Sequence, residues 1–303
     1  MQQSVTARGP IGARARHSRS PAIWLLLPTL VSMVGLVVYP LARGFYTSLT
    51  TSFFLSNQAV FAGFKNYAIL LHNPVFWMVV WHGLVWTVGV VLGQLIFGFV
   101  GALILNQPIW GQAIFQSVTF IPWIMPGVAA GLLWSLMYDP TFGLVGNLQH
   151  FWGFSSIAYL SNVHTSMAAV VVAAIWKGTP FTILMMLAGL QTVDTAVTEA
   201  ARIDGASWFK VIRHAVIPQV APVVRTTALF ITVWTFNYFD MIYVMTNGGP
   251  VNSTQIFPTY VYQLAFGQLD YGLGTAAGIL SLVVVGIIAA LFIFELARQG
   301  ALD

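Results

Sequence analysis

The chain has 303 residues, of which 58% are hydrophobic and 7% are charged. Soluble proteins are about a quarter charged, so this composition cannot cover a globule with polar surface and excludes a water-soluble domain. The formal net charge of +4 rests on only twelve lysines and arginines, which suits membrane orientation better than nucleic-acid binding, and the absence of cysteine excludes disulfides and thiolate catalysis.

Apolar segments recur along the chain at about the 20 residues that a helix needs to cross the hydrocarbon core. The runs are continuous rather than alternating, which excludes a transmembrane barrel. We therefore expect an all-α, polytopic membrane protein with a basic tail at 1–21 and a transmembrane domain at 22–303. The predicted spans cover residues 22–48, 76–105, 113–138, 165–190, 221–246 and 270–296.

The distribution of lysine and arginine predicts which ends of the spans face the cytoplasm, because cytoplasmic loops carry the excess of positive charge. The external connections 139–164 and 247–269 contain neither residue. Both termini are therefore expected in the cytoplasm. The predicted internal charges are Arg8, Arg14, Arg16, Arg19, Arg202, Lys210, Arg213, Arg225 and Arg298, and the predicted external ones are Arg43 and Lys65.

Two external segments have features of ordered structure. Apolar residues at helical spacing before Pro74 predict a short interfacial helix. Trp77, Trp81 and Trp86 follow it and are typical of an aromatic belt that anchors a span at the membrane surface. The turn signal NGGP at 247–250 predicts a loop that faces an external binding protein.

Ionisable groups at membrane depth are costly and mark solute pathways by default. Lys177 lies near the middle of the fourth span and Asp240 lies in the outer half of the fifth. Lys177 attracts an anionic substrate, or else it pairs with Asp240 or with backbone carbonyls between helices. Gly178 and Pro180 weaken the same helix and predict a kink beside a cavity.

The connection at 191–220 is the most polar long stretch of the chain. Asp194 is placed to cap a helix, Glu199 and Arg202 are spaced to pair across one turn, and Gly205 ends that helix. Ser207 begins a second helix that we expect Pro218 to close. These residues predict two short hinged helices with small side chains facing outward, which either dock a partner protein or lie on lipid headgroups.

The same connection resembles the EAA loop of bacterial ABC importer permeases. The residues that match the pattern are Glu199, Ala200, Ala201, Gly205 and Pro218, whereas Ala215 and Ile217 depart from it. Segments at 63–77, 176–193 and 239–266 also resemble permeases of the maltose and glycerol-3-phosphate transporter class. The order of these four segments and the six spans match the same class.

The resemblance implies a permease subunit of an importer in a bacterial cytoplasmic membrane, with sugars or glycerol phosphates as solutes. Its partners would be membrane lipid, a second permease, two copies of a cytoplasmic ATPase and an external solute-binding protein, with no nucleic acid. The connection would form a coupling helix that inserts into the ATPase. The coupling residues implied are Glu199, Ala200, Ala201, Arg202, Asp204 and Gly205, and the substrate-binding residues are Lys177, Gly178, Phe181, Trp234, Thr235, Asn237 and Tyr238.

The chain itself has no ATPase motif. A P-loop needs glycine immediately before its lysine, but Lys65, Lys177 and Lys210 follow Phe64, Trp176 and Phe209. No cofactor is therefore expected in this chain, and ATP and Mg would be bound by the partner ATPase. The six histidines lack metal-ligand spacing, and no catalytic set of side chains is recognised. An intramembrane enzyme and an ion-coupled carrier are the alternatives.

Overall fold

The computed structural model describes residues 20–51, 59–108 and 110–298. Residues 1–19 of the predicted basic tail lie outside this part of the chain. Two compact units are present, Met1–Tyr46 and Thr47–Asp303. Helix α1 (Ser20–Met33) continues through the π-helical turn η1 (Val34–Val38) into α2 (Tyr39–Ser48), whose last two residues belong to the second unit. This helix confirms the first predicted span, since its stretch Leu26–Ser48 is long and apolar enough to cross a membrane.

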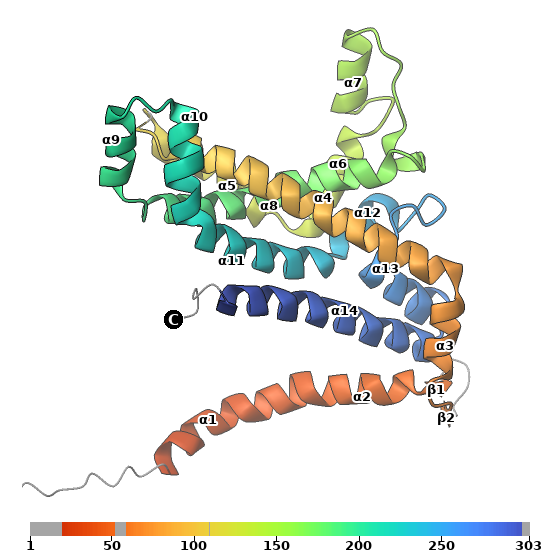
Figure 1. Ribbon diagram of the computed structural model, residues 1–303. Coiled ribbons are helices and arrows are strands. Elements are labelled where there is room, and N and C mark those ends of the chain that lie inside the picture. The colour runs from red at the N-terminus through yellow and green to blue at the C-terminus, as the bar shows by residue number, and fades with distance from the viewer. Residues whose placement is uncertain (1–19, 52–58, 109, 299–303) are drawn as a thin grey trace, which may run out of the picture. The chain divides into compact units, whose positions relative to one another are not determined.

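The second unit is built on long helices that lie side by side (Figure 1). Helix α4 begins where the Asn73 side chain accepts a hydrogen bond from the Val75 N–H at 2.9 Å. Glycines on α4 let it approach α8 closely, as small residues do between membrane helices. The four long helices are α4 (Pro74–Leu105), α8 (Ser166–Leu190), α11 (Ile217–Phe236) and α14 (Tyr271–Arg298).

The third predicted span is broken. Helix α5 (Gln112–Ile124) and helix α6 (Gly127–Met137) meet at an angle of 97° instead of forming one rod over 113–138. Pro126 has no N–H to donate, and it forces Met125 into an extended conformation with ψ 135°. The chain therefore stops being helical at Met125 and begins again at Gly127.

The fifth predicted span also has different ends from those expected. Helix α10 (Trp208–Val211), η3 (Ile212–Val216) and α11 are continuous. Pro218 lies inside this continuous helix, directly after the π-helical turn η3, so it does not close the second helix of the 191–220 connection as we expected. The outer part of the span is a separate helix, α12 (Asp240–Thr246), after a break at residues 237–239.

Short elements cluster at the end of the unit where α4 begins and α11 ends (Figure 1). Helix α3 (Lys65–His72) confirms the predicted short helix. The strands pair antiparallel with Thr50 opposite Phe61. The elements at this end are β1 (Thr50–Thr51), β2 (Val60–Phe61), α3, η2 (Tyr159–Ser161), α13 (Phe257–Tyr262) and η4 (Gln263–Gly267). Helix α7 (Leu144–Phe151) stands apart from them and projects beyond α6 (Figure 1).

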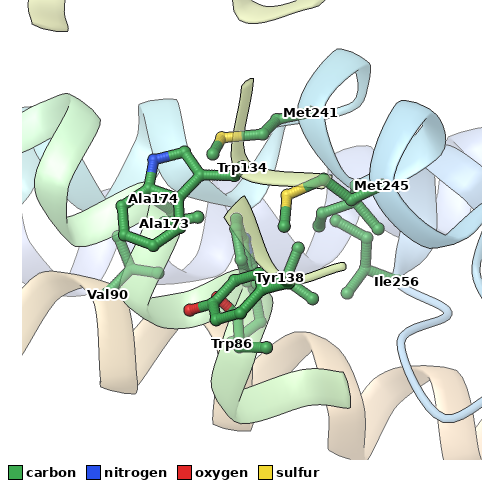
Figure 2. Close-up of a cluster of buried hydrophobic side chains, with 12 residues drawn as sticks. Trp86, Val90, Trp134, Tyr138, Ala173, Ala174, Met241, Met245 and Ile256 are labelled. Atoms are coloured by element: carbon green, nitrogen blue, oxygen red, sulfur yellow. The ribbon is translucent and has the colours of Figure 1, made fainter. Parts of the chain in front are cut away.

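One buried cluster joins α4, α6, α8 and α12 (Figure 2). Trp86 is fully buried in it, whereas Trp77 and Trp81 are more than half exposed. The prediction that all three tryptophans anchor the membrane surface is therefore wrong for Trp86. Its indole N–H donates to the Thr235 carbonyl at 2.9 Å, so it ties α4 to the end of α11.

Candidate functional site

A cavity of about 180 Å³ lies between α4, α5, α8 and α11. Gly178 lies at the midpoint of α8, so the cavity is at the middle of that span. The wall is mostly apolar, with a few polar side chains, which is typical of small-molecule sites. The residues that line it are Trp86, Val90, Gln94, Trp123, Ala174, Lys177, Gly178, Phe181, Ile231, Trp234, Thr235 and Tyr238.

Aromatic rings from three helices form a connected wall in this cavity. Trp123 stacks on Phe181 with ring centroids 6.0 Å apart and planes 21° apart. Phe181 meets Trp234 edge-on at 5.7 Å. The three rings come from α5, α8 and α11, so any movement between these helices changes the shape of the wall.

The cavity has few polar groups, and some of them have hydrogen-bond partners in the protein whereas others do not. Gln94 Nε2 donates to the Ala174 carbonyl at 3.2 Å. Tyr238 has a buried hydroxyl with no hydrogen-bond partner in the described part of the chain. A buried hydroxyl without a partner is costly, and it is available to a ligand that brings one.

Lys177 has a protein partner. Its Nζ donates to the backbone carbonyl of Met125 at 2.8 Å, and within the described residues no ion pair joins it to Asp240. Of the interpretations left open by the sequence, the contact with a backbone carbonyl between helices is the one present.

Six of the seven residues that the resemblance implied for substrate binding line this one cavity. Asn237 does not line it. That residue ends α11, and its side-chain amide donates back to the Val233 carbonyl at 2.8 Å. The six lining residues are Lys177, Gly178, Phe181, Trp234, Thr235 and Tyr238.

The sequence did not assign six further lining residues to the cavity, and three of these six are polar or aromatic. Gln94 is a single amide within a long apolar span, which is the signal that could have identified it. Trp123 stands between two prolines, so it lies beside the helix break. Trp86 was hidden by its neighbours, because three tryptophans at the start of a span fit an aromatic belt equally well.

The 191–220 connection protrudes at the opposite end of the unit from α3 and α13 (Figure 1). Its first helix is α9 (Thr195–Ile203), which Asp194 caps by accepting a hydrogen bond from the Ala196 N–H at 2.8 Å. This confirms the predicted cap. At the other end, Gly205 has a φ of +77°, a conformation that glycine adopts without strain.

Two hydrogen bonds close the end of α9. The Gly205 N–H donates to the Arg202 carbonyl and the Ala206 N–H donates to the Ala201 carbonyl, both at 3.0 Å. This pair is a Schellman motif, and it explains why glycine follows the helix. The chain reverses there and enters α10 directly.

The exposed side of α9 is apolar as well as charged. Ile203 is 86% exposed, and Val197, Glu199 and Ala200 are exposed too. Ala201 is half-buried and packs toward the cluster at the ends of α4 and α8, so it is not on the outward face as we expected. Within the described chain, no ion pair joins Glu199 to Arg202, and both side chains remain available at the surface.

These features define a class: an all-helical membrane protein of five or six spans, with a central cavity and a protruding helix pair at one end. The chain matches the family described as binding-protein-dependent transport system inner membrane component over residues 94–299, and it belongs to that family. It is the membrane-embedded permease of a transport system, not the ATPase, and it is a multi-pass inner-membrane protein.

Curated relatives match most of the chain. It is 33% identical over 264 residues to the trehalose/maltose transport system permease protein MalF from Thermococcus litoralis, covering 86% of this chain and 88% of the relative. It is 32% identical over 273 residues to the sulfoquinovosyl glycerol transport system permease protein SmoG from Agrobacterium fabrum, covering 90% and 89%. Family membership favours a permease over an intramembrane enzyme.

The fold matches a solved transporter. One chain of the bacterial alginate ABC transporter, solved in complex with an alginate pentasaccharide-bound periplasmic protein, superposes with a TM-score of 0.79. The match covers 93% of this chain and 95% of that chain at 20% identity. This likeness shows the fold of a type I ABC importer permease.

Proposed function

We propose that this chain is the permease subunit of an ATP-driven importer that carries a saccharide or glycoside across a bacterial cytoplasmic membrane. The observation that carries the proposal is the aromatic cavity at the middle of the spans, which Trp123, Phe181 and Trp234 line. A cavity enclosed by spans is where a solute is held between its two exposures in an alternating-access cycle.

The chemistry of the cavity suits a saccharide. Sugar rings present apolar C–H faces that pack on aromatic rings, and hydroxyls that need hydrogen-bond partners. The three rings supply the first kind of contact. Gln94 and the unpartnered hydroxyl of Tyr238 supply the second. The two relatives described above are named for trehalose/maltose and for sulfoquinovosyl glycerol, which supports a glycosidic solute.

The proposed engine is a pair of cytoplasmic ATPase subunits that dock on α9. The exposed apolar side chains of Val197 and Ile203 favour a protein partner, because buried apolar contacts are what hold a docked helix. Glu199 and Arg202 are exposed at the same surface, where they can make charged contacts. ATP-driven closure of the ATPase pair would move α9 and thereby the helices joined to it.

The charge distribution supports a cytoplasmic position for α9. Arg202, Lys210 and Arg213 lie in the segment from α9 through η3, and Arg298 ends α14 near the same end of the unit. The opposite end carries Lys65. This asymmetry is the one that cytoplasmic loops show. We propose that an external solute-binding protein delivers the solute to the opposite end and that a second permease completes the pathway.

Ligand-stimulated ATPase activity of the reconstituted complex tests the proposal. The complex is assembled with its own ATPase, second permease and binding protein, and is then exposed to neutral disaccharides, acidic glycosides, glycerol phosphates and amino acids. We expect stimulation by at least one saccharide and none by amino acids. Trp234→Ala should reduce that stimulation while the ATPase still copurifies. Stimulation by amino acids alone would contradict a saccharide site.

A further inference from the structure

Two charged side chains from different helices meet the break in the third span. Lys177 comes from the middle of α8, and Asp240 is the first residue of α12. Both face the short link at Met125 and Pro126, where α5 ends and α6 begins. A charged side chain in a membrane-spanning segment is costly, so each of these two charges requires a structural or functional reason.

The lysine contacts the C-terminal end of α5, the helix that precedes the break. Met125 ends α5, and the last carbonyls of a helix have no partner within it. Lys177 Nζ donates to the Met125 carbonyl at 2.8 Å. A cation at a helix C-terminus is also favoured by the helix dipole, more so away from water.

The carboxylate of Asp240 lies at the N-terminal end of α6, the helix that follows the break. Gly127 is the first residue of α6, and a Cβ there would overlap the carboxylate of Asp240. The carboxylate therefore lies directly against the start of α6. Asp240 Oδ1 also accepts from the Met241 N–H at 3.0 Å, at the start of α12. The carboxylate thus faces the N-terminus of α6, where negative charge is stabilising.

The two charges do not form an ion pair with each other in the described residues. Each is used instead at the helix end whose dipole it complements. We propose that Lys177 and Asp240 are positioning residues that hold the two arms of the broken span at their angle. This inference rests on the proposed function only in treating the neighbouring cavity as the solute site.

The position of Trp123 follows from this arrangement. Trp123 is two residues before Met125, and its ring forms one wall of the cavity by stacking on Phe181. Holding the Met125 carbonyl therefore fixes that wall. Lys177 acts on the solute through Trp123 and not by binding an anionic group of the solute.

The angle between the arms can be measured directly. The chain has no cysteine, so two cysteines can be introduced as the only labelling sites of this subunit. Val118 on α5 and Leu132 on α6 are exposed, and a spin label is attached to a cysteine at each of these positions. The distance between the labels is measured in the assembled complex without solute. We expect a narrow distribution in the parent, and a shifted or broadened one in Lys177→Met and Asp240→Asn.

Further variants separate holding of the break from other effects. Lys177→Arg keeps a donor and should keep the narrow distribution. The exchange Lys177→Asp with Asp240→Lys should remain as defective as the single variants, because both charges then face the wrong helix ends. Gly127→Ala should displace the carboxylate, while Gly131→Ala, which meets only Val244 at 3.2 Å and the Met241 carbonyl at 3.4 Å, serves as its control.

Solute-stimulated ATPase activity gives a second measurement. If Lys177 holds the break, Lys177→Met should reduce ATPase stimulation by neutral and by acidic glycosides alike, by about tenfold, as a change of about 1.4 kcal/mol produces. An unchanged label distance, restoration by the charge exchange, or a loss confined to acidic solutes would each overturn the inference. A changed distance in a complex that no saccharide stimulates would support the inference and contradict only the proposed function.

Discussion

The indole of Trp86 donates its hydrogen bond to the carbonyl of Thr235, a residue 149 positions further along the chain. Trp86 is fully buried in the middle of α4, and Thr235 lies one residue before the end of α11. Both residues line the cavity. The bond therefore fixes the outer end of α11 against α4 at the point where the proposed solute site is built.

Replacement of Trp86 tests this bond. Trp86→Phe removes the donor and part of the buried ring, but the Thr235 carbonyl keeps its bond from the Tyr238 N–H. We expect a loss of more than about 1 kcal/mol in stability, because the hydrogen bond contributes about 1 kcal/mol and the smaller ring also leaves a cavity. We also expect a higher solute concentration for half-maximal ATPase stimulation. Trp81→Phe, at a residue 61% exposed, is the control and should change neither.

Gly178 is required by the neighbouring helix. A Cβ at this position would overlap the amide of Gln94, which bonds the Ala174 carbonyl. Gly178→Ala should therefore push Gln94 away and reduce solute affinity in a direct binding assay. Gly89→Ala lies at the same α4–α8 contact but meets only Val171 at 3.3 Å, outside the cavity. Equal loss of affinity in both variants would show that helix packing, not the cavity, is affected.

The cap of α9 provides a test of coupling. Asp194→Ala removes the acceptor for the Ala196 N–H and should cost about 1 kcal/mol of helix stability. We expect weaker retention of the ATPase when the complex is washed on an affinity column. Asp194→Asn keeps a capping oxygen and should retain the ATPase. Loss in both variants would indicate that the charge of Asp194, and not its cap, matters.

Alanine substitutions at two glycines can distinguish the effect of backbone strain from the effect on ATPase docking. Gly205 and Gly153 have φ values of +77° and +78°, and a Cβ added to either would meet no atom within 4 Å. Alanine at either site should cost about 1 kcal/mol, because the left-handed conformation strains a side chain. Only Gly205→Ala should reduce ATPase retention and solute-stimulated hydrolysis, since Gly153 follows α7 at the other end. Equal effects would mean that global stability alone limits the complex.

Much of this fold follows from local signals in the sequence. Apolar length predicted the spans, and Asp194 and Gly205 predicted both ends of α9, because caps and left-handed turns depend on neighbouring residues. The break at Met125 was missed although Pro126 carries its signal, since proline is tolerated within membrane helices. Pro218 was misread for the opposite reason, because a π-helical turn just before it lets the membrane helix continue through the proline.

The cavity depended on information that no local pattern holds. Lys177 and Gly178 were singled out by a charge and a weakened helix within a span, Phe181 and Trp234 were implied by resemblance to a family, and the structure brings the four together. Trp86 and Trp123 reach the same cavity from other helices, and their positions depend on tertiary contacts such as the bond to Thr235. A periodicity rule assigns a face to a side chain but cannot say which distant helix covers that face.

The helix that starts at Trp208 runs without interruption to Phe236, a length of 29 residues. At a rise of 1.5 Å per residue it is a rod of about 44 Å. One end of this helix adjoins α9, where we propose that the ATPase docks, and the other end carries Trp234 and Thr235. A tilt imposed at the first end arrives as a sideways displacement at the second, so the subunit has a lever built from a single unbroken piece of backbone.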